Sequence, residues 1–244
     1  MDLGLRGKTA IVCGATSGLG LASAEALSEE GANVAMFARR RDKLELEANR
    51  LGALAVRGDV TNATDLERLV ELTLKAFGGI DILVWNSGGP PAGPATETSD
   101  GGLEAAFELL LLPAVRLVRL CLPSLQASDA GRIVCITSAA VKEPTANLAL
   151  SNTIRPGVTG WAKTLSRELG PKGITVNCVA PGRIDTPRMS ELYGEGGPPP
   201  AELAQIPLGR LGKSTELGAA ICFLCSAGAG FITGHVLPHA GGWA

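Results

Sequence analysis

The sequence is poor in the residues that most often carry chemistry near neutral pH. Aromatic residues make up 4% of its 244 residues, and it has two histidines and a single tyrosine, Tyr193. Cys222 and Cys225 form a C-x-x-C, but no second pair and no histidine stands at metal-ligand spacing. The six cysteines lie mostly inside apolar segments, so we expect buried free thiols and no bound metal.

Strong charge and long apolar runs are lacking too. The formal net charge is −2, which gives no electrostatic footprint for nucleic acid or an anionic membrane. No apolar run reaches the roughly 18 residues that a membrane span needs, and the first residues lack a signal peptide's charged segment and cleavage site. These absences predict a cytoplasmic protein with neither nucleic acid nor membrane as a partner.

Short apolar runs alternate with longer amphipathic stretches, such as 63–77 and 157–169. The runs that we expect to form strands are 9–13, 33–38, 53–60, 81–86, 132–137, 175–180 and 235–238. Nearly continuous apolar strands separated by helices are typical of a parallel sheet covered on both faces. The pattern predicts a single α/β domain over 1–244, with a doubly wound, Rossmann-type sheet of about seven strands.

One segment, 191–210, is long, irregular and rich in glycine and proline. Such a segment inside a compact domain is more often a functional lid than part of the scaffold. An ordinary surface loop is the alternative. We therefore expect a substrate lid at about 187–210.

The turn after the first expected strand reads "CGATSGLG", with glycines at Gly14, Gly18 and Gly20. A turn from a strand into a helix can direct backbone N–H groups and the helix N-terminus at a pyrophosphate. Gly14 would permit a tight turn, Gly18 a close approach of phosphate, and Gly20 close packing of helix on strand. The context predicts a dinucleotide site, with a purely structural use of the glycines as the alternative.

The glycine spacing is not G-x-G-x-x-G but resembles the T-G-x-x-x-G-x-G of the short-chain dehydrogenase/reductase family. Four further segments resemble family motifs in the same order: "GDV" (58–60), "WNSGG" (85–89), "VNCVAPGRIDTP" (176–187) and "ITGHVLPHAGG" (232–242). Ala240 departs from the acidic residue usual in the last motif. The resemblance covers essentially the whole chain and is strongest to the 3-oxoacyl-acyl carrier protein reductase-like branch.

The resemblance implies hydride transfer between a nicotinamide cofactor and a carbonyl or alcohol, with a 3-oxoacyl thioester as a first substrate. It also implies a homo-oligomer, a dimer or tetramer, formed through the helices expected at about 100–126 and 147–170. The positions that it implies for cofactor binding are Gly14, Thr16, Ser17, Gly18, Leu19, Gly20, Asp59, Val60, Asn86, Ser87, Gly88, Arg155, Pro181, Gly182, Ile184 and Thr186.

The choice of cofactor can be argued from charge after the second strand. A carboxylate there would accept a hydrogen bond from a ribose 2′-hydroxyl and repel a 2′-phosphate. This chain has Ala38 at about that position, followed by Arg39, Arg40 and Arg41. Because guanidinium groups pair well with phosphate, we place Arg39 on it and predict NADP(H) in preference to NAD(H). A solvated basic helix start is the alternative, and it suits Arg41 better.

The family's usual catalytic residues are Asn, Ser, Tyr and Lys, and only the serine is matched. Ser138 follows an expected strand and would lie where ligands bind at the carboxyl ends of such sheets. A serine that only satisfies its own turn is the alternative. The Asn position falls on Leu110. Pro113 would free the carbonyl of Leu109 to hold a water, unless the proline only kinks the helix.

The Tyr and Lys positions fall on Ser151 and Arg155, which are four apart and would share one helix face. Arg155 keeps a positive charge toward the cofactor but cannot relay protons. The Ser151 hydroxyl would lie about 4 Å closer to the backbone than that of a tyrosine and ionises far less readily. Pro156 should bend the helix just past Arg155. We therefore expect the usual proton transfer to fail; Tyr193, in the lid, is a remote substitute.

Two functions follow from these residues. The first is an NADP(H)-dependent reductase with an atypical active site, in which Ser138 polarises the carbonyl. The second is a protein that binds the cofactor without turnover and serves as a sensor or as the partner of an active relative. A different reaction on the same scaffold is a third alternative.

Overall fold

The computed structural model describes residues 2–194 and 196–243. Seven parallel strands form one sheet in the order β3-β2-β1-β4-β5-β6-β9. Their bounds are β1 Thr9–Cys13, β2 Asn33–Ala38, β3 Leu54–Arg57, β4 Ile82–Trp85, β5 Arg132–Ile136, β6 Thr175–Pro181 and β9 Val236–His239. The predicted doubly wound sheet is confirmed, and the strand order reverses between β1 and β4, where such folds bind ligands.

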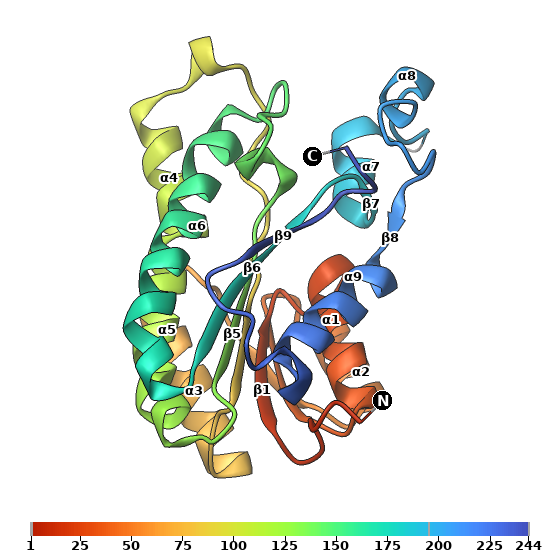
Figure 1. Ribbon diagram of the computed structural model, residues 1–244. Coiled ribbons are helices and arrows are strands. Elements are labelled where there is room, and N and C mark those ends of the chain that lie inside the picture. The colour runs from red at the N-terminus through yellow and green to blue at the C-terminus, as the bar shows by residue number, and fades with distance from the viewer. Residues whose placement is uncertain (1, 195, 244) are drawn as a thin grey trace.

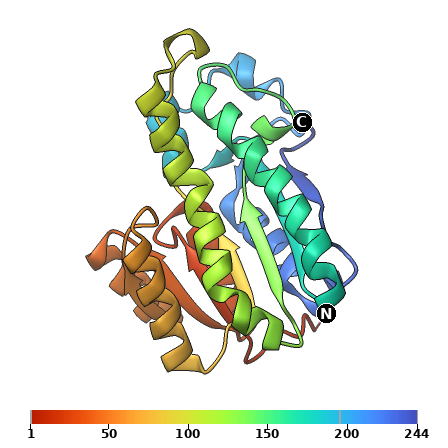
Figure 2. The same cartoon turned by 90° about the vertical axis from the view of Figure 1, so that its left-hand side faces the viewer.

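Helices cover both faces of the sheet (Figure 1). One face carries α1 (Gly18–Glu29), α2 (Arg41–Leu51) and α9 (Ser214–Cys225), and the other carries α3 (Ala63–Phe77), α4 (Asp100–Leu110), α5 (Leu112–Ala127) and α6 (Ala149–Leu169). In Figure 2, α4 and α5 follow one another alongside α6 on the outer surface of that second face. None of the described helices is long and apolar enough to cross a membrane.

Local sequence explains where these helices begin and end, and α3 is the clearest case. The Asn62 side chain caps its start by accepting from the N–H groups of Thr64 and Asp65, and Gly78 ends it with φ at 79°. Its buried residues, Leu66, Leu69, Val70 and Thr73, recur at helical spacing. This periodicity lets one stripe of α3 pack on the sheet while the rest faces solvent.

The core has two layers, one on each side of the sheet. Neighbouring residues of β1 separate into them: Ile11 packs in the layer under α3, α5 and α6, whereas Val12 packs in the layer under α1 and α9. Both side chains are fully buried. Strands buried on both faces explain why the apolar runs in the sequence are nearly continuous.

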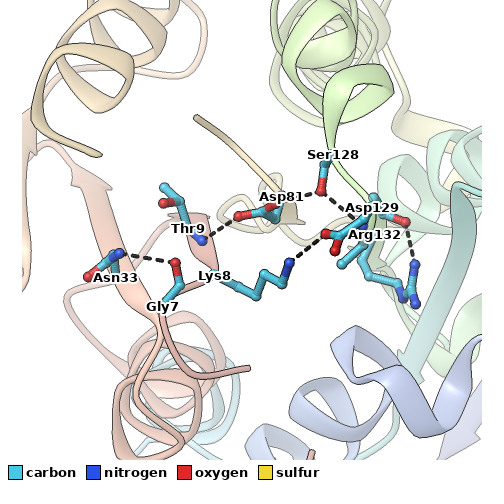
Figure 3. A network of polar contacts seen from close by, with 10 residues as sticks. Gly7, Lys8, Thr9, Asn33, Asp81, Ser128, Asp129 and Arg132 are labelled. Atoms are coloured by element: carbon cyan, nitrogen blue, oxygen red, sulfur yellow. Dashed lines mark hydrogen bonds and ion pairs between the residues drawn. The ribbon is translucent and has the colours of Figure 1, made fainter. Parts of the chain in front are cut away.

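Polar contacts fasten the amino ends of the strands, at the edge opposite the candidate site (Figure 3). The carboxylate of Asp81, just before β4, accepts from the backbone N–H of Thr9 in β1 and from the Ser128 hydroxyl. Lys8 pairs with Asp129 across the same edge. These contacts tie β1 to the segments that flank β4 and β5.

Two prolines lie in the helices beside the site, at Pro113 and Pro156. α4 ends before Leu111, and Pro113 is the second residue of α5. The N–H groups of a helix's first turn have no partner within that helix, so the missing N–H of Pro113 costs α5 no hydrogen bond. By contrast, Pro156 lies inside α6, which continues to Leu169 without a break. The expected 157–169 helix therefore begins earlier, at Ala149.

The expected lid is more regular than its composition indicated. It contains α7 (Pro187–Tyr193) and α8 (Pro200–Leu203), and a two-strand ladder of β7 (Ile184–Asp185) with β8 (Gly212–Lys213) borders it. Prolines begin both helices, a position that favours rather than interrupts a helix. In Figure 1 these elements project beyond the carboxyl ends of the strands. Short 3₁₀ turns lie at Ala95–Glu97, Ala139–Val141, Gly170–Lys172 and Ala227–Ala229.

Candidate functional site

A cavity of about 900 Å³ opens at the carboxyl ends of β1, β4, β5 and β6. Its walls bring together nearly all of the residues that the sequence indicated: Gly14, Thr16, Ser17, Gly18, Leu19, Arg39, Asp59, Val60, Asn86, Ser87, Gly88, Ser138, Ser151, Arg155, Pro181, Gly182, Ile184 and Thr186. Gly20 is the exception, since it is buried behind the turn. The volume is that of a site for a cofactor-sized molecule.

The glycine turn has no room for side chains at its three glycines, as the sequence predicted. Gly14 and Gly18 have φ of 62° and 55°, a backbone conformation that favours glycine. A Cβ on Gly20 would lie 2.3 Å from the Gly14 carbonyl oxygen, and one on Gly14 would lie 2.6 Å from Nδ2 of Asn86. Gly20 therefore packs α1 onto the turn, as expected, rather than facing the cavity.

The N-terminus of α1 is open toward this turn. Ser17 occupies the capping position, but its side chain makes no capping hydrogen bond. The unpaired N–H groups of a first helical turn, with the positive end of the helix dipole, suit a phosphate group. The residues present thus fit the pyrophosphate of a dinucleotide.

The arginines after β2 divide their roles in a way the sequence did not reveal. Arg40 donates from Nη2 to Oγ1 of Thr16 at 3.1 Å and to Oγ of Ser17 at 3.0 Å, so its guanidinium lies over the glycine turn. The side chain of Arg39 is 78% exposed, with Nη1 3.9 Å from Oδ2 of Asp59. Arg41 pairs with Glu45 on the surface. Both Arg39 and Arg40 line the cavity.

Ser138 stands at the end of β5 and begins a 3₁₀ turn. Its Oγ accepts a hydrogen bond from the N–H of Ala140 at 3.1 Å, so the serine does satisfy its own turn. That contact uses a lone pair of the oxygen and leaves the hydroxyl proton free. Because Ser138 also lines the cavity, it can still donate to a carbonyl oxygen there.

Ser151 and Arg155 share one face of α6 and contact each other. Nε of Arg155 donates to Oγ of Ser151 at 3.0 Å, and Nη1 donates to the carbonyl oxygens of Thr137 at 3.0 Å and Ile136 at 3.4 Å. Burial, with a smaller effect of the Arg188 charge, lowers the pKa of Arg155 to about 10. Arg155 therefore stays positively charged near neutral pH and is fixed to the end of β5.

The position of the family's asparagine carries no polar side chain. Leu110 there is 1% exposed. Its neighbour Leu109 lines the cavity, just before the break between α4 and α5. Instead of one helix with an interior proline, there are two helices that meet at Leu111, which keeps a right-handed helical conformation (φ −110°, ψ −53°) and the bonds Leu111 N–H to Phe107 O and Val115 N–H to Leu111 O.

The segment 187–210, which the sequence predicts to be a lid and which keeps that name below, contributes residues that sequence reasoning did not assign to the site. Arg188, in α7, donates from Nη2 to the carbonyl oxygen of Pro90 at 2.8 Å and from Nη1 to Glu191 at 3.0 Å. It thereby joins the lid to the loop after β4 on the other side of the cavity. Nothing in the sequence signals this contact, since it depends on the fold bringing positions far apart in the chain together.

A second group of contacts holds the lid from within. Glu202 accepts from the Tyr193 hydroxyl at 2.6 Å and from Arg183 at 2.7 Å, and the Arg183 guanidinium lies 4.5 Å from the ring centre of Trp243. Burial and the Glu202 carboxylate raise the pKa of Tyr193. The only proton of this hydroxyl is therefore engaged within the lid, which argues against Tyr193 as the substitute acid.

Metal chemistry finds no support among the described residues. No group of histidine, cysteine and carboxylate side chains within 2–194 and 196–243 is arranged to hold a metal ion. The cysteines are buried and free. Burial raises the pKa of Cys222 to about 11, so this thiol stays protonated near neutral pH.

Comparison with known proteins gives consistent matches over the whole chain. Residues 14–244 match the family model described as enoyl-(acyl carrier protein) reductase. The 3-oxoacyl-[acyl-carrier-protein] reductase FabG of Vibrio cholerae is 34% identical over 242 residues, which cover 98% of each chain.

Two solved structures share the architecture and were determined with NADPH. L-Sorbose reductase from Gluconobacter frateurii, in complex with NADPH and L-sorbose, is 32% identical with a TM-score of 0.93, over 100% of this chain and 98% of that one. An NADPH-bound short-chain oxidoreductase from Pseudomonas aeruginosa PAO1, described as containing an atypical catalytic center, is 31% identical with a TM-score of 0.89, over 97% and 96%.

Proposed function

Because the chain belongs to the short-chain dehydrogenase/reductase family of oxidoreductases, we propose that it uses NADP(H) to interconvert a carbonyl and an alcohol. The observation that carries this proposal is one continuous cavity, which joins the glycine turn to Ser138, Ser151 and Arg155. NADPH-bound relatives of the same fold support the choice of cofactor. Arg39 and Arg40 support it independently, because both present guanidinium groups beside the turn.

Several residues would hold the cofactor. The glycine turn and the open end of α1 would take the pyrophosphate, Arg39 and Arg40 the 2′-phosphate, and Asp59 with Val60 the adenine side. Pro181, Ile184 and Thr186 line the cavity on the lid side and would flank the nicotinamide. When bound, NADPH supplies the hydride for the carbonyl carbon.

The chain's own residues act on the carbonyl oxygen. Ser138 donates its free hydroxyl proton in a hydrogen bond to that oxygen. The fixed charge of Arg155 stabilises the negative charge that develops there. Ser151 passes a proton to the oxygen and takes one from water; its own oxygen accepts from Nε of Arg155, which eases the loss of that proton. Lacking a tyrosine, this route should be slower than a positioned general acid by roughly 10²–10⁴.

One observation favours the second function, cofactor binding without turnover. Two of the three donor nitrogens of Arg155 are used by Ser151 and by the carbonyl oxygens at the end of β5, so the residue is held as a structural brace. The side chains that bind the cofactor are retained, whereas those that move the proton are replaced. A sensor or a partner subunit would need only the former.

Titration and turnover separate these functions. NADPH binding is followed by its own fluorescence, and its consumption by absorbance with a carbonyl panel that includes a 3-oxoacyl thioester and a ketose sugar. Binding with consumption supports the reductase. Binding without consumption of NADPH, and without reduction of NADP⁺ by the matching alcohols, favours the sensor or partner subunit. Absence of binding contradicts both functions.

We also propose a homotetramer in the cytoplasm, by analogy with the family. The outer surface formed by α4, α5 and α6 would supply one contact between subunits (Figure 2). Phe107 on α4 is 41% exposed, which suits such a contact. Sedimentation equilibrium measures the mass directly, and a monomer at micromolar concentration would contradict this assembly.

A further inference from the structure

Three guanidinium groups line the part of the cavity between β5, α6 and the lid, and two of them have carboxylate partners. Arg183 pairs with Glu202 at 2.7 Å, and Arg188 pairs with Glu191 at 3.0 Å. Arg155 pairs with no carboxylate within residues 2–194 and 196–243. Its positive charge is the one at this end of the cavity that the described residues leave uncompensated.

The geometry of Arg155 leaves one nitrogen for a ligand. Nε and Nη1 are used by Ser151, Thr137 and Ile136, whereas Nη2 donates to none of the described residues. Arg155 is only partly buried and lines the cavity, so a ligand there can reach this nitrogen.

Arg188 adds a second positive charge from the lid. Its guanidinium lies against the backbone of Gly89, where a Cβ would come within 2.9 Å of Nη2. The bond from Nη2 to the Pro90 carbonyl fixes it there. Arg188 is close enough to Arg155 for its charge to contribute to the lowered pKa of Arg155. Two neighbouring cations that face one cavity disfavour each other unless an anion lies between them.

The cofactor's phosphates do not supply that anion. The glycine turn and the end of α1 provide the pyrophosphate site, and Arg39 and Arg40 stand beside it. Arg155 and Arg188 instead lie with Ser138, at the reacting end of the proposed site. Arg188 already pairs with Glu191, so we expect the group that neutralises the Arg155 charge to come with the substrate.

We propose that the substrate carries an anionic oxyacid group near its reacting carbonyl, and that Arg155 and Arg188 bind this group. The inference rests on the proposed function, since it names the substrate class for the same cavity. Planar guanidinium groups match carboxylate and phosphate oxygens in pairs, so both are candidates. A neutral ketone or sugar would leave the charge of Arg155 without an anionic partner.

Matched pairs of probes test this inference by calorimetry, with saturating NADPH and without it. Acetoacetate is compared with methyl acetoacetate for the carboxylate, and dihydroxyacetone phosphate with dihydroxyacetone for the phosphate. We expect one acid to bind roughly 10- to 100-fold more tightly than its neutral partner, the gain typical of a hydrogen bond to a charged group. Which pair shows the preference identifies the oxyacid.

Variants assign the preference to the two arginines. Arg155→Gln and Arg188→Gln should each reduce it to about threefold or less, and Arg188→Lys should retain part of it. Arg210→Gln is the control for Arg188→Gln, because Arg210, like Arg188, is an exposed arginine paired with a glutamate, Glu216, but does not line the cavity. Circular dichroism checks that each variant is folded, and if Arg155→Gln does not fold, Arg188→Gln decides.

Equal binding of acid and neutral partner in both pairs, or a preference that survives Arg155→Gln and Arg188→Gln, would overturn the inference. Calorimetry detects the anion whether or not NADPH is consumed. A preference for the acid without turnover would therefore support the anion site and contradict only the proposed reduction. Turnover of neutral ketones with no preference for acids would support the proposed reduction and contradict the anion site.

Discussion

Nε of Arg155 lies 3.0 Å from Oγ of Ser151, so the two residues that replace a tyrosine and a lysine are joined to each other. In α6 they keep the four-residue spacing, and both line the cavity. The charge is retained and the acid is not, because arginine cannot give up its proton near neutral pH and serine ionises far less readily than tyrosine. We therefore expect proton delivery to limit reduction at this site.

Restoring the acid should raise turnover. In the double variant Ser151→Tyr/Arg155→Lys, the phenol extends into the cavity from a position that is 7% exposed, and the lysine lowers its pKa. We expect NADPH consumption with an accepted ketone to rise by about tenfold or more, within the usual contribution of a positioned general acid. Arg155→Lys alone is the control and should show no such rise. An unchanged rate in a double variant that still binds NADPH would show that another step limits turnover.

The arginines after β2 should select the phosphate of NADPH. Arg39→Gln and Arg40→Gln should each weaken NADPH binding by about tenfold, because each removes a charge-assisted contact, and NADH binding should change little. Arg41→Gln is the matched control, since Arg41 pairs with Glu45 on the surface. Fluorescence titration with both cofactors measures the four affinities. If Arg41→Gln weakened NADPH binding as much, the effect would come from the overall positive charge of this segment and not from contacts of Arg39 and Arg40 with the phosphate.

A side chain behind the glycine turn should abolish cofactor binding. Gly20→Ala would place a Cβ 2.3 Å from the Gly14 carbonyl, so the turn must shift, at a cost of about 1–3 kcal/mol in the free energy of unfolding. Gly160→Ala is the control, because a Cβ there meets nothing within 4 Å on α6. It should stabilise the protein by about 0.5–1 kcal/mol. Chemical denaturation and NADPH titration together check both expectations.

Acid should loosen the lid. The hydrogen bond from Tyr193 and the charge of Arg183 lower the pKa of Glu202 below its ordinary 4.5. A carboxyl group with a lowered pKa contributes stability above about pH 4.5 and loses it as the pH falls through the lowered value. Hydrogen exchange across α7 and α8 should thus quicken on acidification.

Glu202→Gln should reproduce that change at pH 7. We expect faster exchange in α7 and α8, with a loss of roughly 1 kcal/mol in the free energy of unfolding, discounted because the Glu202 side chain is 31% exposed. Glu191→Gln is the matched control, since Glu191 is 62% exposed and holds only Arg188. Exchange in Glu202→Gln that matches the unaltered protein would rule out this contact as the brace of the lid.

The sheet could be predicted from sequence because its signals are local and repeated. All seven strands fall within a residue or two of their apolar runs at most ends, and the largest difference is at 53–60, where β3 is only Leu54–Arg57. There the apolar run continues into the "GDV" segment, which turns toward the cavity. Gly58 packs closely against the Phe37 ring there, since a Cβ on it would lie 2.5 Å from that ring.

The side-chain directions at the site could not be predicted in the same way. Three consecutive arginines after β2 look alike in the sequence, and only the start of α2 decides that Arg40 turns toward Thr16 and Ser17. Likewise, Arg188 acts on the cavity only because α7 folds back over Pro90. Such contacts join positions far apart in the chain and carry no periodic signal.

The polar network at the amino ends of the strands has a consequence for how such a chain can change over evolution. Asp81, Ser128, Lys8 and Asp129 secure the sheet at the edge opposite the cavity (Figure 3). Substitutions among the reacting residues therefore leave this fastening untouched. A tyrosine and a lysine could therefore be replaced by Ser151 and Arg155 during evolution while the fold and its cavity were kept. Selection could then act on a folded protein that still binds ligands and favour a different reaction.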